Sequence, residues 1–316
     1  MEPLIEQLQN EPAIRHKLVV GLLTKPADGK EAQEASILVK DSPQVQSLIS
    51  AYRKGGYKSR HPYYKWMGAH WILAQLADLG YPAGDEELRP MMNQAYDWLL
   101  GGEHAKHILL IDGRTRRCAS QESNAVHYSI KLGLADSRTE DLAKRLMKWQ
   151  WPDGGWNCDK RPEVTRSSFM ETLIPLRALA LYAQTSGDKA AHSATEKAAE
   201  VFLKRKLFLR MSDNGIMDQH FISLHYPCYW HYDILFALKV MTEAGFIRDP
   251  RCQPALDLLE SLRLPDGGFA ASEKFYRLSR ADISGFSEVN WGGISRKRQN
   301  PYVSVEALSV LKAAGR

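Results

Sequence analysis

The chain has 316 residues, of which 44% are hydrophobic and 25% charged, and it carries a net charge of +5. These values are ordinary for a globular protein with a substantial core, and they exclude disordered and fibrous chains. Because no dense run of Lys or Arg occurs, we expect no nucleic-acid partner, while the mild positive charge permits an anionic substrate.

The N-terminal sequence, the absence of long apolar runs and the cysteine pattern indicate where the protein is located. The N-terminus lacks the basic region and apolar stretch of a signal peptide, and no run approaches the roughly 18 apolar residues of a membrane helix. The four cysteines are scattered without a CxxC pair, which is typical of reduced thiols. We therefore expect a cytoplasmic protein without a transmembrane segment. The sequence does not indicate an oligomeric state.

Two kinds of helix are predicted to alternate along the chain. We expect residues 1–52 to form an N-terminal helical element that packs on the remainder, 53–316, in one domain overall. Residues 66–79, 171–182 and 303–315 are apolar on nearly every side, as buried helices are. Between such stretches lie amphipathic ones, for example around Leu142 and Leu146, with one polar face.

Turn signals divide the chain into repeats. Aspartates suited to capping a helix N-terminus precede the amphipathic stretches, at Asp85, Asp136, Asp188 and Asp249. Glycines suited to ending the buried helices stand at Gly80, Gly133, Gly187 and Gly245. Asp-Gly turns such as PDGG at 152–155 follow the amphipathic helices.

Helical hairpins of this kind must stack to bury both faces. An inner ring of apolar helices within an outer ring of amphipathic ones satisfies every face. We therefore predict an all-α fold, an (α/α) toroid or double-ring barrel of about five to six helical hairpins. An open superhelical solenoid is the alternative, although it would expose one side of the inner helices.

The stretch QWPDGGW at residues 150–156 resembles the Q-x2-D-G-x-W repeat of squalene and oxidosqualene cyclases. Similar turns occur in protein prenyltransferase β subunits and in several polysaccharide lyases, which share the double-ring architecture. The resemblance implies that Gln150 and Trp156 are structural, tying the outer helices to the turn. The chain departs from these families in lacking the DxDD acid of the cyclases and the zinc-binding Asp-x-Cys of the prenyltransferases.

A toroid has its cavity at the end where the Asp-Gly loops lead into the inner helices, and the helix N-termini there offer free N–H groups. The candidate catalytic residues in these loops are Asp159, Glu171, His225, His231 and Asp233. A carboxylate beside an apolar cavity can act as acid or base, but for any single carboxylate a favourable charge at a helix N-terminus is the simpler interpretation.

The segment HYPCYWHYD, residues 225–233, is predicted to begin a helix at Pro227, with His225, Cys228 and His231 near one face. Aromatic packing is the simpler interpretation of this pattern. We predict no metal site and no cofactor, although a divalent metal is compatible with these residues, whose weak candidate ligands are Cys158, His220 and Cys228.

Aromatic and basic residues of the same loops are the predicted substrate-binding groups: Tyr63, Trp66, Arg117, Arg166, Tyr226, Trp230, Trp291 and Arg298. Aromatic rings could stabilise carbocations or stack on sugars, and arginines could bind phosphate or carboxylate. The first hypothesis is thus a cyclase- or prenyltransferase-like enzyme acting on an isoprenoid or isoprenyl diphosphate. The second is a lyase or hydrolase acting on an acidic saccharide, and the third a non-catalytic toroid that binds a ligand or partner.

Overall fold

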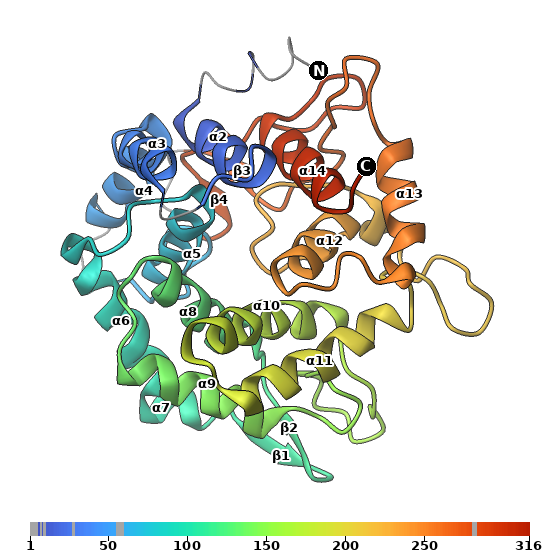
Figure 1. Ribbon diagram of the computed structural model, residues 1–316. Coiled ribbons are helices and arrows are strands. Elements are labelled where there is room, and N and C mark those ends of the chain that lie inside the picture. Colours follow the sequence, from blue (N-terminus) through green and yellow to red (C-terminus); the bar gives the residue numbers. More distant parts are fainter. Residues whose placement is uncertain (1–5, 7, 9–10, 27–28, 55–59, 280–282) are drawn as a thin grey trace.

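The computed structural model describes residues 6, 8, 11–26, 29–54, 60–279 and 283–316 and is mostly helical, which confirms the all-α prediction (Figure 1). Among the described residues, no helix is both long and apolar enough to cross a membrane. The longer helices are α3 (Lys30–Lys40), α4 (Pro43–Lys54), α5 (Ala69–Leu79), α6 (Arg89–Leu100), α8 (Ser120–Lys131), α9 (Ser137–Trp149), α10 (Phe169–Ser186), α11 (Lys189–Leu203), α12 (Ile234–Glu243), α13 (Gln253–Ser261) and α14 (Pro301–Ala313).

A circuit of helices in mutual contact surrounds the centre of the molecule (Figure 1). The short α2 (Pro12–Lys17) contacts α5, α5 contacts α8, and α8 contacts α10. Helix α10 then contacts α12, α12 contacts α14, and α14 returns to α2. The N-terminal region therefore does more than cover the remaining chain, because α2 completes this circuit.

A second layer of helices lies outside the first. Helix α3 packs on α2, α6 on α5 and α8, α9 on α8 and α10, α11 on α10, and α13 on α12 and α14 (Figure 1). The inner helices α5, α10, α12 and α14 are buried over most of their length, whereas the outer helices bury one face. The burial of α5, α10, α12 and α14 agrees with the predicted apolar helices, whereas the inner helix α8 buries polar side chains such as Glu122, Asn124 and His127.

The predicted aspartates and glycines stand at the starts and ends of these helices. Asp136 and Asp188 accept backbone hydrogen bonds at the starts of α9 and α11. Asp85 and Asp249 do the same for the short helices η2 (Glu86–Leu88) and η4 (Pro250–Cys252). Glycines with positive φ follow the inner helices, as at Gly80 after α5 and Gly187 after α10. The remaining short helices are η1 (Leu18–Leu22), α7 (Gly102–Ala105) and η3 (Gln219–Ile222).

Extended structure is confined to two small ladders within the described residues. Strands β1 (Leu109–Ile111) and β2 (Arg114–Arg116) form an antiparallel hairpin around Asp112 and Gly113. Strands β3 (Arg277–Leu278) and β4 (Phe286–Ser287) pair in parallel. Neither ladder forms a layer of the core.

The predicted helix at residues 227–233 is wrong. Residues 225–233 form turns and extended backbone, and α12 begins only at Ile234. The reason is Asp233, which adopts extended dihedral angles and accepts a hydrogen bond from the Phe236 N–H at 2.7 Å. An aspartate in this role marks the residue before the first helical turn.

The segments that lead into the inner helices meet one another. Trp66, ahead of α5, stacks on Tyr229, ahead of α12, with ring centroids 3.6 Å apart. Tyr226 of the same segment packs against Trp291, ahead of α14. Arg116, ahead of α8, pairs with Asn157, ahead of α10. The N-terminal ends of these helices therefore gather at one end of the molecule.

Candidate functional site

The PDGGW turn is part of the scaffold. The Gln150 side chain donates hydrogen bonds to the carbonyl oxygens of Gly154 and Ala194, both at 2.8 Å, and so joins the turn to α11. The buried Trp156 donates its indole N–H to the carbonyl oxygen of Leu146 in α9 at 3.0 Å. These bonds are the structural role that the resemblance implied for Gln150 and Trp156.

His225 and Asp233, which were both predicted as catalytic residues, form a buried pair. His225 Nδ1 lies 2.8 Å from Asp233 Oδ2, and the two side chains are 0% and 1% exposed. Burial lowers the pKa of His225, but the charge and hydrogen bond of Asp233 outweigh this effect and leave the pKa raised. His225 Nε2 has no hydrogen-bond partner among the described residues. The pair therefore holds one imidazole nitrogen and leaves the other available.

A cavity of about 50 Å³ lies beside this pair, between α5, α8, α10, α12 and α14. His225, Tyr226 and Cys228 line one side of it, and Asn124 and His127 of α8 line another. A cavity of this size accommodates a few water molecules or one small polar group. Its lining combines aromatic side chains with charged ones.

The charged lining belongs to an ion-pair network at the centre of the inner helices. Lys239 of α12 lies 2.8 Å from Asp78 of α5 and 2.7 Å from Glu306 of α14. Lys17 contacts the same two carboxylates, at 3.1 and 2.6 Å. Burial raises the pKa of Asp78, but the surrounding cations outweigh it and hold that pKa well below its usual range. The phenol of Tyr226 donates a hydrogen bond to Asp78 at 3.0 Å, which links the network to the cavity wall.

Arg177 of α10 extends this network outward. Its guanidinium lies 3.7 Å from Asp78 and 2.6 Å from Glu243 at the end of α12. Burial raises the pKa of Glu243, but Arg177 overcomes this effect and lowers it to about 2. Charges of both signs thus balance within the ring of inner helices.

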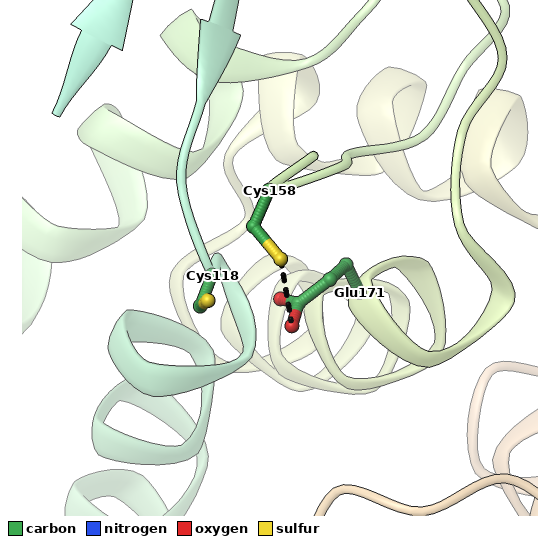
Figure 2. Close-up of side chains that lie close together, drawn as sticks. All are labelled: Cys118, Cys158 and Glu171. Carbon is green, nitrogen blue, oxygen red and sulfur yellow. Dashed lines mark hydrogen bonds between the residues drawn. The ribbon is translucent and has the colours of Figure 1, made fainter. Parts of the chain in front are cut away.

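A second cluster combines Cys118, Cys158 and Glu171 (Figure 2). Cys118 precedes α8, Cys158 lies in the loop after the PDGGW turn, and Glu171 is in the first turn of α10. The Cys158 thiol points at the Glu171 carboxylate, with Sγ 3.9 Å from Oε1 (Figure 2). All three donor atoms lie within 4.8 Å of one another.

The titration behaviour of the cluster reflects its burial. Burial raises the pKa of Glu171 to about 6, although this carboxylate accepts a hydrogen bond from the Ser120 N–H at 3.1 Å. The Cys118 thiol hydrogen-bonds with Cys158, which raises the pKa of Cys118 and lowers that of Cys158. The two thiols are therefore inequivalent.

Polar side chains continue from this cluster along the start of α8. Arg117 hydrogen-bonds to Gln121 and His104, and its Nε lies 3.4 Å from Glu122 Oε1. His104 Nε2 and Glu122 Oε1 are 2.6 Å apart and both side chains are buried. Burial raises the pKa of Tyr63, ahead of α5, to about 12, although its hydroxyl hydrogen-bonds with Gln121. The predicted binding residues Tyr63 and Arg117 thus share one neighbour.

Several predicted aromatic residues pack against one another. Trp66 is buried between Tyr229 and Trp71. Trp230 stacks on His231, whose other face stacks on Phe275 with ring centroids 3.5 Å apart. Burial lowers the pKa of His231 to about 3, so it is neutral at physiological pH. Trp291 is buried against Tyr226 and Tyr302.

Other predicted residues pair with neighbouring charges or are exposed, although Asp159 directly follows Cys158 of the second cluster. Asp159 forms a 2.6 Å ion pair with Arg161, whose hydrogen bond lowers the pKa of Asp159 to about 2. This pairing leaves Asp159 an anion at neutral pH and a poor general acid. Arg166 and Arg298 are exposed. His220 is also exposed and pairs with Glu273, so the predicted grouping of His220 or Cys228 with Cys158 does not form.

Sequence reasoning missed the central ion pairs and the role of Cys118. Asp78, Arg177, Lys239 and Glu306 each stand as an isolated charge within a strongly apolar helix. The sequence could have predicted that these residues form ion pairs, because a charge on a buried helix requires a partner. Cys118 carried no comparable signal, since its contact with Cys158 depends on how two loops meet.

No protein-family model, curated protein or solved structure matches this chain at a significant level. The candidate sites are therefore assigned from geometry.

Proposed function

We propose that the protein is an enzyme with an (α/α) toroid fold and that its reaction centre is the cavity beside His225 and Asp233. The closed circuit of helix contacts from α2 to α14 supports the toroid. The gathering of inner-helix N-termini at one end, together with the buried His225–Asp233 pair, supports a reaction centre there.

The lining of the cavity favours a polar, anionic substrate over an isoprenoid chain. A hydrocarbon chain in the cavity would lie against the charged groups of Asp78, Lys239 and Glu306 without offering them a hydrogen bond, which is unfavourable. A substrate carboxylate could instead bind Lys239 or Arg177 by taking the place of one of their present carboxylate partners, Asp78, Glu306 or Glu243. The supported function is therefore the second hypothesis, a lyase acting on an acidic saccharide.

In this reaction, His225 Nε2 would remove the proton α to the substrate carboxylate. The electron pair of that C–H bond forms a carbon–carbon double bond while the neighbouring glycosidic C–O bond breaks, and the departing sugar oxygen takes the proton from the His225 imidazolium. Asp233 would hold the imidazole through Nδ1 and stabilise its protonated form. Because the cavity holds only about 50 Å³, side chains of its lining, which includes residues 225–229, must move to admit a sugar.

One observation favours the isoprenoid hypothesis as a second candidate. Trp66, Trp71 and Tyr229 form a continuous aromatic cluster beside the cavity. Aromatic faces of this kind stabilise carbocations. Lys65, whose ammonium group lies 5.5 Å from the centre of the Trp66 ring, would then receive the diphosphate.

The test is a comparison of two substrate classes on the purified protein. Uronic-acid oligosaccharides are assayed for the ultraviolet absorption of an unsaturated uronate, and isoprenyl diphosphates for release of diphosphate. The proposal predicts unsaturated product and its loss, by roughly 10²–10⁴-fold in kcat/KM, in His225→Gln. His220→Gln, which alters an exposed histidine, serves as the matched control. Diphosphate release without unsaturated product would assign the isoprenoid function instead.

A further inference from the structure

The trio Cys118, Cys158 and Glu171 takes no part in the proposed reaction at His225. Its three donor atoms come from three separate segments of the chain and converge within 4.8 Å (Figure 2). Glu171 is fixed by the backbone N–H of Ser120, and its side chain is buried. A carboxylate and two thiols brought together in this way are a set of metal ligands.

The spacing fits a tetrahedral zinc ion. With Zn–S and Zn–O bonds of about 2.3 and 2.1 Å, tetrahedral ligands lie roughly 3.6 to 3.8 Å apart. The Cys158 Sγ to Glu171 Oε1 distance of 3.9 Å is already close to this value. The other pairs lie within 4.8 Å, so side-chain rotations that move the donor atoms by up to about 1 Å would complete the geometry.

The surroundings compensate the charge of the ligands. Two thiolates and a carboxylate carry three negative charges, which Zn²⁺ reduces to one. Cys118 stands two residues before α8, and Glu171 is in the first turn of α10, so the positive ends of two helix dipoles face the trio. The guanidinium of Arg117 adds a positive charge beside Cys118.

We propose that Cys118, Cys158 and Glu171 bind a zinc ion through three protein ligands, with the fourth position occupied by water. Two thiolates favour zinc over Mg²⁺ and Ca²⁺, which prefer oxygen ligands. The site holds the start of α8, the 157–160 loop and the start of α10 together. This inference is independent of the proposed function, because none of its ligands lines the cavity beside His225.

The experiment measures zinc in the full-length protein purified under reducing conditions, by mass spectrometry of the metal and by competition with a chromophoric chelator. We expect about one zinc per chain, and affinity at least roughly tenfold weaker in Cys118→Ser, Cys158→Ser and Glu171→Gln. Cys252→Ser is the matched control, since Cys252 is a buried thiol outside the trio, and it should keep the metal.

A second measurement separates ligand loss from misfolding. Cobalt substituted for zinc should show thiolate-to-metal charge-transfer absorption and the visible bands of a tetrahedral ion. Glu171→Gln retains both thiols, so we expect its charge-transfer absorption to persist at saturating cobalt while the affinity falls. A wild-type chain that fails to bind added Zn²⁺ or Co²⁺ would overturn the proposal. So would a Cys118–Cys158 disulfide that persists under the same reducing conditions.

Discussion

The His225 imidazole lies 2.8 Å from the Asp233 carboxylate, and Asp233 also accepts the backbone N–H of His225 at 2.9 Å. One aspartate thus closes the turn before α12, caps that helix and holds the imidazole. The three roles are linked because the residues are only eight positions apart, so the cap that ends the loop also places the histidine at the cavity.

Replacing Asp233 with Asn should alter the titration of His225. The carboxylate outweighs burial and raises the histidine pKa, so the neutral amide should allow burial to lower that pKa below its ordinary value. NMR titration of labelled histidine measures this change directly. If His225 acts as the base, the acid limb of the pH–rate profile should move in the same direction. A histidine pKa unchanged in Asp233→Asn would contradict the assignment of the pair.

His231 should make the fold sensitive to acid. Its folded-state pKa is lowered to about 3, while in the unfolded chain it is about 6.5, so the unfolded state binds the proton first. The stability that depends on neutral His231 is therefore complete above about pH 6.5 and decreases as the pH falls. The variant His231→Phe retains stacking on Trp230 and Phe275. Its free energy of unfolding should decrease less between about pH 6 and pH 4 than that of the wild-type protein. The difference in slope should approach about 1.4 kcal/mol per pH unit. Urea unfolding at several pH values measures it, and parallel curves for the two proteins would refute it.

Gly154 should tolerate no side chain, because its backbone has φ of 101° and an added Cβ would lie 2.3 Å from the carbonyl oxygen of Lys197. Gly245 has φ of 84° with nothing within 4 Å of the same position and is the matched control. Gly245→Ala should cost about 1–2 kcal/mol from backbone strain alone, and Gly154→Ala clearly more. Thermal and urea unfolding compare them. Equal losses of unfolding free energy in Gly154→Ala and Gly245→Ala would show that the turn is not in close contact with α11.

Gln150 should contribute measurably to stability. Gln150→Ala removes the two hydrogen bonds that join the PDGGW turn to α11, and we expect a loss of about 1–3 kcal/mol. Gln184→Ala removes one bond at an exposed position, to the carbonyl oxygen of Glu243, and should cost under about 1 kcal/mol. Urea unfolding measures both variants. A loss in Gln150→Ala no larger than that in Gln184→Ala would argue against the scaffold role.

Local patterns in the chain predicted the helices well but predicted the sites only in part. Asp136 and Gly80 were correctly assigned as a cap and a helix end because capping depends on a few neighbouring residues. The segment 225–233 was misassigned because Pro227 and Asp233 are both compatible with a helix start. The extended backbone at Asp233 shows that the helix begins after Asp233 and not at Pro227. His225 and Asp233 were found, but not their contact.

The sequence by itself determined that the most apolar helices are buried, that others keep a polar face, and where capped helices such as α5 end and α9 begins, since periodicity and capping act within a few turns of one helix. The tertiary structure decided which distant side chains meet. Lys17 reaches Glu306 across 289 positions, and Cys118, Cys158 and Glu171 meet from three separate segments of the chain. Such contacts depend on how the helices pack around one another, and the residue spacing within a single segment does not predict that packing.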